Sequence, residues 1–218
     1  MAPTTEICTL NLVAGSEIGD PNNAASGVLK ECGDVLAQQD GQQTFQFGTT
    51  VENPGDLQLF INWDAKSDHE KFMASDTYPS FVKTFSTIFT GDPQIVHVDF
   101  EPAGGAKAAM SAPVTEIATF YYDNEPPEDS FAGAKKLVEA LQKDGQNIFG
   151  WAFGKTHEVI ERDGAKGKGN VLVIGWETVQ AHLDARQTQA FKDNIHHLRT
   201  PQVKAAEVHH VAILNYQG

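Results

Sequence analysis

Histidine is the side chain in this sequence best suited to moving a proton near neutral pH, and the chain contains eight. His97 and Asp99 are two residues apart in a predicted strand, so their side chains share one face, where a carboxylate can hold the imidazole in one tautomer. His209 and His210 are adjacent in another predicted strand, so one side chain points to each face. We predict that these four residues include the catalytic groups, with either His209 or His210 facing the ligand.

Two further histidines, His69 and His182, lie in the first turn of two predicted helices. The free amides and positive dipole end of a helix start favour a neutral imidazole, which can accept from an amide or pack on a nearby tryptophan. We therefore predict a structural role for both, alongside a place in the ligand-binding set given below. His196 and His197 are expected to be a solvated pair, and His157 has no predicted role.

Tyr78 is the remaining candidate for chemistry, because its hydroxyl can donate a hydrogen bond to a substrate oxygen. The alternative is a half-buried tyrosine at the helix break made by Pro79. Aromatic side chains on the predicted strands and helices favour a cavity that accepts a flat, apolar molecule. The residues predicted to line this cavity are Phe47, Asn62, Trp63, His69, Phe72, Tyr121, Trp151, Phe153, Trp176 and His182.

Local motifs for other kinds of chemistry are missing from the sequence. The histidines show neither an H-x-x-x-H spacing nor a local two-His-one-carboxylate set, and two cysteines are too few for a thiolate metal site or a disulfide framework. The glycine-rich segments 103–105 and 164–169 lack the strand-to-helix context of a phosphate loop. There is also no Gly-x-Ser-x-Gly motif. We predict that the protein uses no metal and no cofactor.

The chain repeats itself, and the repeat identifies the elements that must position these residues. Thr5-Glu6-Ile7 returns 110 positions later as Thr115-Glu116-Ile117. Further segments return in the same order, namely Phe45–Gly48 as Trp151–Gly154, Phe60–Trp63 as Val173–Trp176, and His69 as His182. Ordered matches of this kind indicate duplication of a module of about 105 residues. A module that normally pairs with its own copy can then build the pair and its cavity within one chain.

Each repeat has the pattern of a strand, a helix, a hairpin, a helix and a strand, which is the β-α-β-β-α-β order of a ferredoxin-like fold. The elements predicted in the first repeat are a strand Glu6–Val13, a helix Asn23–Gln39, a hairpin of Phe45–Val51 with Leu57–Trp63, a second helix broken near Pro79, and a strand Ile95–Phe100. The second helix is expected to begin at a capping box, Ser67-Asp68-His69-Glu70.

The second repeat is predicted from the same pattern. Its elements are a strand Glu116–Tyr122, a helix Asp129–Lys143, a hairpin of Ile148–Ile160 with Asn170–Trp176, a helix Val179–Leu198 and a strand Glu207–Asn215. We expect residues 163–169 to form a loop and residues 102–114 to form an extended linker. The predicted organisation is therefore a first ferredoxin-like repeat at 1–101, the linker at 102–114, and a second repeat at 115–218.

The composition limits the partners of the protein. A formal net charge of −13 repels nucleic acid and anionic lipid, so neither is an expected partner. The sequence has no apolar run of about 18 residues and no signal segment after Met1. With two cysteines that fit a reducing compartment, these features predict a cytoplasmic protein.

The segment that follows the first repeated tryptophan resembles the dimeric α+β barrel superfamily, which includes antibiotic-biosynthesis monooxygenase-like and stress-responsive barrel proteins. The residues that carry the resemblance are Trp63, Asp64, His69, Phe72, Ser75, Tyr78 and Phe81. It covers the chain apart from the linker, and it implies two ferredoxin-like sheets packed face to face as a pseudo-dimeric α+β barrel around a small-molecule cavity. Such a chain is a folded monomer that can also form a homodimer. Cyclases of this superfamily carry catalytic Tyr and His residues where this chain has Phe72 and Tyr78, which argues against their cyclisation chemistry.

The leading hypothesis is a cofactor-independent, monooxygenase-like enzyme that acts on a hydrophobic natural-product intermediate, polyketide-like or terpenoid-like. Histidine-assisted proton transfer would serve an oxygenation, a cyclisation or an elimination. One alternative is a haem-binding tandem ferredoxin-like protein with His182 or His196 as axial ligand. Another is a non-catalytic small-molecule-binding or stress-response protein. Because residues facing the barrel would reach a ligand, we expect His97→Ala or His210→Ala to lose at least about tenfold in turnover.

Overall fold

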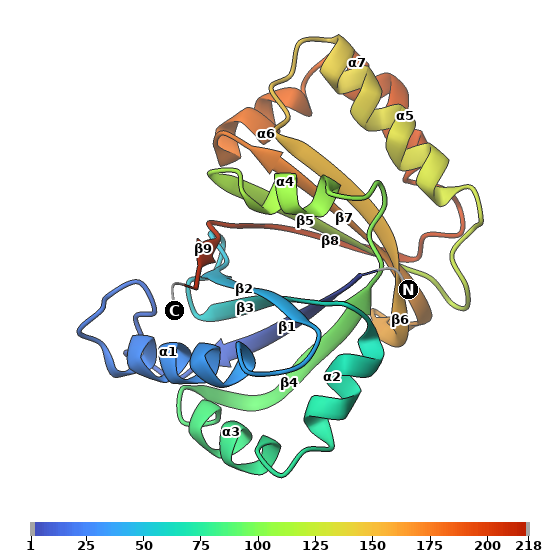
Figure 1. Ribbon diagram of the computed structural model, residues 1–218. Coiled ribbons are helices and arrows are strands. Elements are labelled where there is room, and N and C mark those ends of the chain that lie inside the picture. Colours follow the sequence, from blue (N-terminus) through green and yellow to red (C-terminus); the bar gives the residue numbers. More distant parts are fainter. Residues whose placement is uncertain (1–2, 217–218) are drawn as a thin grey trace. The chain divides into compact units, whose positions relative to one another are not determined.

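The computed structural model describes residues 3–216, which form two compact units. Unit 1 holds the residues up to His97 together with the segment that begins at Leu214, and unit 2 holds residues 98–213. Both units contain a four-stranded β-α-β-β-α-β arrangement, as the sequence repeat predicts (Figure 1). In both, the second helix is split into two shorter helices.

Unit 1 is built on a sheet with strand order β4-β1-β3-β2. The strand β1 pairs antiparallel with β3, and β3 pairs antiparallel with β2. Helices α1, α2 and α3 cover one face of this sheet (Figure 1). The elements are β1 Thr4–Leu12, α1 Ala24–Leu36, β2 Gln42–Thr49, β3 Asp56–Trp63, α2 Lys66–Met73, α3 Tyr78–Phe85 and β4 Phe89–Val98.

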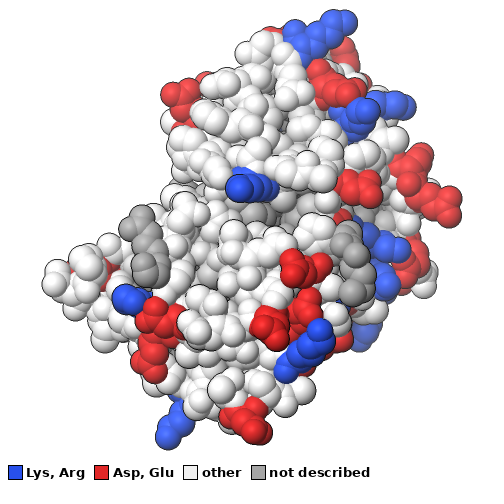
Figure 2. Space-filling model, viewed as in Figure 1, with Lys and Arg blue, Asp and Glu red and all other residues white. Residues whose placement is uncertain are grey.

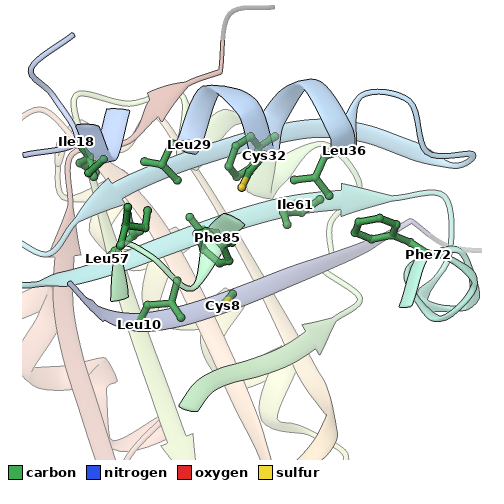
Figure 3. Close-up of a cluster of buried hydrophobic side chains, with 14 of the residues drawn as sticks. Cys8, Leu10, Ile18, Leu29, Cys32, Leu36, Leu57, Ile61, Phe72 and Phe85 are labelled. Carbon is green, nitrogen blue, oxygen red and sulfur yellow. The ribbon is translucent and has the colours of Figure 1, made fainter. Parts of the chain in front are cut away.

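The core of unit 1 lies between the sheet and its helices. Helix α1 begins after Asn23, whose side chain accepts a hydrogen bond from the amide of Ala25 at 3.0 Å, as a good N-cap does. Leu29, Cys32 and Leu36 on one face of α1 point to the strands (Figure 3). The helical spacing in the sequence thus becomes a buried apolar stripe.

Strand pairing decides which side chains of unit 1 face the helices. Alternate residues of β3, from Leu57 to Trp63, belong to this core. Directly opposed residues of an antiparallel pair share a face, and Glu6 of β1 lies opposite Ile61. Glu6 is buried on this side of the sheet, within an otherwise apolar layer.

Unit 2 repeats the architecture with strand order β8-β5-β7-β6. Its apolar core again lies against the helices, with Leu137, Val138 and Leu141 of α5 packed on the sheet. The elements are α4 Gly105–Met110, β5 Val114–Tyr121, α5 Ser130–Lys143, β6 Gly150–Arg162, β7 Ala165–Trp176, α6 Val179–Ala185, α7 Gln189–Asn194, a 3₁₀ turn η1 Ile195–His197, and β8 Ala205–Val211.

The register of β5 with β8 separates the two adjacent histidines. His210 lies opposite Glu116 and His209 lies opposite Ile117. Glu116 also lies opposite Ile174, which belongs to the core under the helices. His210 therefore faces the helices of unit 2, and His209 lies on the other face of the sheet.

Three predicted local features differ from the structure. Helix α2 begins after Ala65, and the amide of Ala65 donates to Asp68 Oδ2 at 3.1 Å, so the expected capping box on Ser67 is wrong. The residues at 105–110 form helix α4, so the linker is not simply extended. The long helix expected at 179–198 is two helices, because Thr188 caps a new start at the amide of Phe191.

The predicted loop at 163–169 is also wrong, because most of it is strand. Arg162 pairs with Ala165, which closes a two-residue turn at Asp163 and Gly164. These two residues have φ angles of 52° and 85°, the left-handed values that such a hairpin turn needs. The backbone ladder with β6, rather than the polar composition, decides the conformation of residues 165–169.

The last predicted strand is divided between the units. Strand β8 ends at Val211, and a short strand β9, Leu214–Asn215, pairs with β2 of unit 1. The hydroxyl of Tyr216 then donates a hydrogen bond to Asp34 of α1. Its ring packs beside Phe45 with centroids 5.8 Å apart. The end of the described chain thus returns to the first unit.

Charged side chains of both signs are interspersed over the face shown in Figure 2. Among the helices of residues 3–216, none combines the length and the apolar character needed to cross a membrane.

Candidate active site

Unit 1 buries a cluster of four polar or aromatic residues, Glu6, Trp63, His69 and His97, which we call the Glu6 cluster. Trp63 Nε1 donates a hydrogen bond to Glu6 Oε2 at 2.9 Å. His69 Nδ1 lies 3.3 Å from the same oxygen and 2.8 Å from His97 Nε2. The His69 ring stacks on Trp63 with centroids 5.3 Å apart. Every member is almost fully buried, so the residues of this network hydrogen-bond mainly to one another rather than to solvent.

Unit 2 contains the same four residue types, Glu116, Trp176, His182 and His210, which we call the Glu116 cluster. Trp176 Nε1 donates to Glu116 Oε2 at 2.8 Å. His182 Nδ1 shares a hydrogen bond with His210 Nε2 at 2.7 Å. The other ring nitrogen of His182, Nε2, lies 3.5 Å from Glu116 Oε1. The His182 ring stacks on Trp176 at 5.4 Å. Of the two contacts expected for His69 and His182, an amide or the preceding tryptophan, the structure shows the stacking on tryptophan.

Equivalent elements supply equivalent members of the two clusters. The glutamate comes from the first strand of each unit, and the tryptophan ends the third strand. One histidine lies in the first half of the helix that follows, and the other lies in the last strand, 28 residues further along in both units. The constellation is therefore a property of the module, and the duplication has carried all four residues into both copies.

The glutamates are the residues that our sequence reasoning missed. Glu6 and Glu116 were visible as part of the repeated Thr-Glu-Ile segment, yet they were not among the predicted site residues. A carboxylate in a strand whose alternate positions are apolar has to be paired when it is buried. Its recurrence at the matched position of the second repeat was the signal that could have identified it.

The two clusters differ in how the helix histidine presents its ring. His69 directs one nitrogen, Nδ1, toward both Glu6 and His97. His182 directs Nε2 toward Glu116 and Nδ1 toward His210. His182 thus contacts Glu116 through one ring nitrogen and His210 through the other. In unit 1 the three ligand-type atoms converge, all within 4.8 Å of one another.

Burial changes the acidity of Glu116. Loss of solvation raises its pKa from 4.5 to about 7, against the opposing effects of the Trp176 hydrogen bond and the charge of Arg186. A carboxyl group in this range exchanges its proton near neutral pH. Such a shift at the wall of a cavity is a common property of catalytic acids and bases.

The Glu116 cluster borders a cavity of about 90 Å³ between the sheet and helices of unit 2. Glu116, Trp176 and His182 lie on its wall, and the exposed Arg186 and Arg199 also contribute to its lining. The remaining lining is apolar and includes Phe120, Leu137, Leu141, Leu172, Ile174, Ala185, Phe191, Leu198 and Val208. The wall therefore combines an apolar surface with a few convergent polar groups.

The structure places the predicted catalytic residues in different environments. His97 and His210 are buried under the helices in the two clusters, whereas we expected them to face a barrel interior. The register of β5 with β8 turns His210 to the same side as Glu116, and His97 meets His69 of α2 on the helix side of its sheet. His209 is half-buried on the opposite face of its sheet.

Asp99 contacts a histidine that had no predicted role. Its Oδ1 lies 3.0 Å from His157 Nε2, with both side chains partly exposed. This pair lies in an open groove of about 460 Å³ in unit 2, which Phe131 and Phe153 also line. Solvent screens the attraction between two groups that are exposed to this degree.

Tyr78 packs as a half-buried aromatic residue beside the helix break. Its ring lies edge-on to Phe72 at 5.2 Å and stacks on Phe81 at 6.1 Å. Burial raises the pKa of its hydroxyl, with a further effect from the charge of Glu6. This environment matches the structural alternative for Tyr78, although its hydroxyl stays near the acidic group of the Glu6 cluster.

The predicted ligand-binding set is divided between the two faces of the sheets. Asn62 accepts from Thr5 Oγ1 and donates to Thr44 Oγ1, both at 2.6 Å, on the face away from the helices. Tyr121 is likewise directed away from them and donates to Glu207 at 3.3 Å. The others lie on the helix side, namely Phe47, Trp63, His69, Phe72, Trp151, Phe153, Trp176 and His182.

Solved structures similar to this one span nearly the whole chain. An anthrone oxidase-like protein has a TM-score of 0.64 at 14% identity, covering 100% of this chain and 95% of its own. A candidate monooxygenase from Fusobacterium nucleatum has a TM-score of 0.60 at 11% identity, covering 100% and 98%. A candidate monooxygenase from Lactobacillus acidophilus NCFM has a TM-score of 0.58 at 14% identity, covering 98% and 94%.

The chain has the fold of these monooxygenase-like proteins. This confirms the mixed α+β fold and the structural resemblance inferred from the sequence. At these identities the likeness concerns the fold. No protein-family model matches the sequence, and no curated protein sequence matches it.

Proposed function

We propose that this protein is a monooxygenase-like enzyme that removes a proton from a hydrophobic small molecule, with Glu116 as the base. The observation that carries the proposal is a buried carboxyl group with a pKa of about 7 on the wall of an apolar cavity. A general base works best when its pKa lies near the operating pH. Glu116 meets this condition through burial.

His182 and His210 complete the proposed path for the proton. After Glu116 takes a proton from the substrate, His182 Nε2 at 3.5 Å can accept it with a small movement, and its Nδ1 passes a proton to His210 at 2.7 Å. Catalytic hydrogen bonds are often longer before substrate binds. Trp176 holds the carboxylate of Glu116 in place through its ring N–H.

The lining of the cavity indicates the substrate class. Aromatic and aliphatic side chains favour an apolar ring system, and Arg186 and Arg199 can attract a phenolate or enolate oxygen. A volume of about 90 Å³ accepts only part of such a molecule. One edge of the ring system, with the reacting C–H group, would occupy this cavity while the rest of the substrate extends past the two arginines. A polyketide-like intermediate with an acidic C–H group fits this description.

Oxygenation is the reaction that such a site serves most directly. Removal of a proton from the methylene carbon of an anthrone leaves a carbanion, which can give electrons to dioxygen. One oxygen atom becomes the new carbonyl and the other leaves as water, so the substrate itself supplies all the electrons. The residues of the site need only bind the ring, take the first proton and return it to the peroxide formed with dioxygen. They then remove the second C–H proton as the O–O bond breaks, so that both protons leave in the water.

The geometry is less suited to the haem alternative. Both ring nitrogens of His182 have partners within 3.5 Å, and the cavity beside it is far smaller than a porphyrin. The ring of His196 lies 4.0 Å from that of His197. An absorption spectrum of the purified protein tests this alternative, and a Soret band would favour it. The non-catalytic alternative predicts binding without turnover.

The experiment that tests the proposal measures oxygen consumption by the purified protein with anthrone as the substrate. We expect Glu116→Gln to keep the size of the side chain and the hydrogen bond from Trp176, and to lose about 100-fold in turnover. The wild-type rate should rise with pH through about 7, as Glu116 loses its proton. Glu139→Gln, on the exposed face of α5, is the matched control. Equal turnover in Glu116→Gln and wild type would contradict the role of Glu116.

A further inference from the structure

We propose that Glu6, His69 and His97 of unit 1 bind a divalent first-row transition-metal ion. The three residues come from β1, α2 and β4. These segments are far apart in the sequence, so a local sequence motif does not identify the site. This site would be separate from the Glu116 cluster, and it is independent of the proposed oxygenation.

The distances between the ligand atoms fit a bound ion. His69 Nδ1 lies 2.8 Å from His97 Nε2 and 3.3 Å from Glu6 Oε2. A metal ion at about 2.0–2.2 Å from each ligand atom separates neighbouring ligands by about 2.8–3.1 Å in octahedral coordination and by about 3.3–3.6 Å in tetrahedral coordination. The two distances from His69 therefore match the spacing that coordination requires, and all three ligand atoms lie within 4.8 Å of one another.

The donor set also fits this class of ion. Two neutral imidazoles and one carboxylate are common ligands of zinc and of non-haem iron, and they leave further positions for water or another small ligand. Glu6, His69 and His97 are all nearly fully buried. A buried carboxylate needs a compensating positive charge or hydrogen bonds, and a divalent ion supplies that charge.

The residues around the ligands hold them in position. Trp63 Nε1 donates to Glu6 Oε2 at 2.9 Å, and the Trp63 ring stacks against His69. Partners of this kind orient metal ligands and raise the affinity of a site. Because two of the ligands are on paired strands and one is on a packed helix, little rearrangement is needed to bind an ion.

The second copy supplies an internal comparison. His182 presents different nitrogens to Glu116 and His210, so these three atoms do not converge as those of unit 1 do. We therefore place the ion in unit 1 alone. The comparison also gives a matched control, because substitutions in unit 2 alter the same residue types.

The test uses the full chain after removal of metals with EDTA, with Zn²⁺ as the probe in calorimetry and elemental analysis. We expect one tightly bound Zn²⁺ per chain, a higher unfolding temperature with Zn²⁺, and a Co²⁺ visible spectrum of a nitrogen- and oxygen-ligated site. Glu6→Gln, which keeps the side-chain size, should weaken Zn²⁺ binding at least about tenfold. His97→Ala should remove the tight site.

Two controls separate this site from adventitious binding. His210→Ala changes the equivalent residue of unit 2 and should keep the tight Zn²⁺ site. Replacing both His196 and His197 by alanine removes an exposed imidazole pair and should also leave the site intact. The proposal is overturned if wild-type protein binds no stoichiometric Zn²⁺, or if Glu6→Gln and His97→Ala, folded by circular dichroism, bind it as wild type does. Since this test measures metal content, its result is independent of the result of the anthrone turnover assay.

Discussion

The Glu6 and Glu116 clusters contain the same four residue types on equivalent elements, yet their geometry suits them to different chemistry. In unit 1 the glutamate and histidine atoms converge within 4.8 Å of one another. In unit 2 His182 contacts Glu116 and His210 through different ring nitrogens, beside a cavity. The comparison teaches that duplication preserves residue types, whereas ring orientation and neighbouring volume determine what each copy can do.

A residue beside the helix histidine differs between the two clusters. Phe72 of α2, three residues after His69, packs on Trp63 with ring centroids 6.3 Å apart. The matched position of α6, three residues after His182, is Ala185, which lines the cavity. A phenyl ring fills space in unit 1 that an alanine leaves open in unit 2. The structure thus has a phenyl ring beside Trp63 in unit 1 and a cavity-lining alanine at the matched position of unit 2.

The largest effect expected from this comparison is on stability. Phe72→Ala should lower the free energy of unfolding by about 3–5 kcal/mol, because it removes a buried ring and leaves a cavity beside Trp63. Urea unfolding followed by circular dichroism measures the change. The reciprocal variant, Ala185→Phe, should fill the unit 2 cavity and abolish anthrone turnover at a smaller cost in stability. If Phe72→Ala were as stable as wild type, the packing explanation would be wrong.

A second effect concerns the pH dependence of stability, which follows from Glu116. Its folded pKa of about 7 lies above the ordinary 4.5, so the folded chain holds a proton that the unfolded chain has already released. Stability should therefore fall as pH rises from about 4.5 to about 7, by about 3 kcal/mol, and level off above that range. Urea unfolding between pH 5 and pH 8 measures this contribution as the difference between wild type and Glu116→Gln. Parallel curves for the two proteins would be incompatible with a raised pKa.

A third effect separates the two strand histidines. His210→Ala should lose at least about tenfold in turnover, about 1.4 kcal/mol, because it removes the end of the proposed proton path. Oxygen consumption with anthrone measures it, with the folded state checked by circular dichroism. For the equivalent variant His97→Ala, the measured quantity is Zn²⁺ binding. Full turnover in His210→Ala would restrict the chemistry to Glu116 and His182.

The smallest effect is expected at the histidine pair near the end of the second unit's helices. His196 is exposed, His197 lies beside it, and both line a groove of about 240 Å³ that contains no member of either cluster. We expect His196→Ala and His197→Ala to change stability by less than about 0.5 kcal/mol and to leave turnover unchanged. A large loss of turnover in either variant would move the site away from the Glu116 cluster.

Local patterns in the sequence predicted most of the architecture. The repeated segments and the change from alternating to helical spacing identified two β-α-β-β-α-β modules, and Asn23 and Pro79 marked a helix start and a helix break correctly. These features depend on residues close together in the chain. The packing of the two sheets as a pseudo-dimeric barrel stays a prediction from the resemblance.

Long-range pairing decided what the local patterns could not. The polar residues at 165–169 became strand because β6 supplies their hydrogen-bond partners. The register of β5 with β8 sent His210 toward the helices and His209 away from them. A shift of one residue would have exchanged the two histidines.

The sequence by itself determined that the module would occur twice and that each copy would carry a Glu, a Trp and two His residues at matched positions. Only the tertiary structure decided that these residues meet, because they come from three strands and a helix that are brought together by the sheet. It also decided that Glu116 is buried beside a cavity, where loss of solvation raises its pKa to about 7. Spacing along the chain carries no information about desolvation, which depends on everything packed around the group.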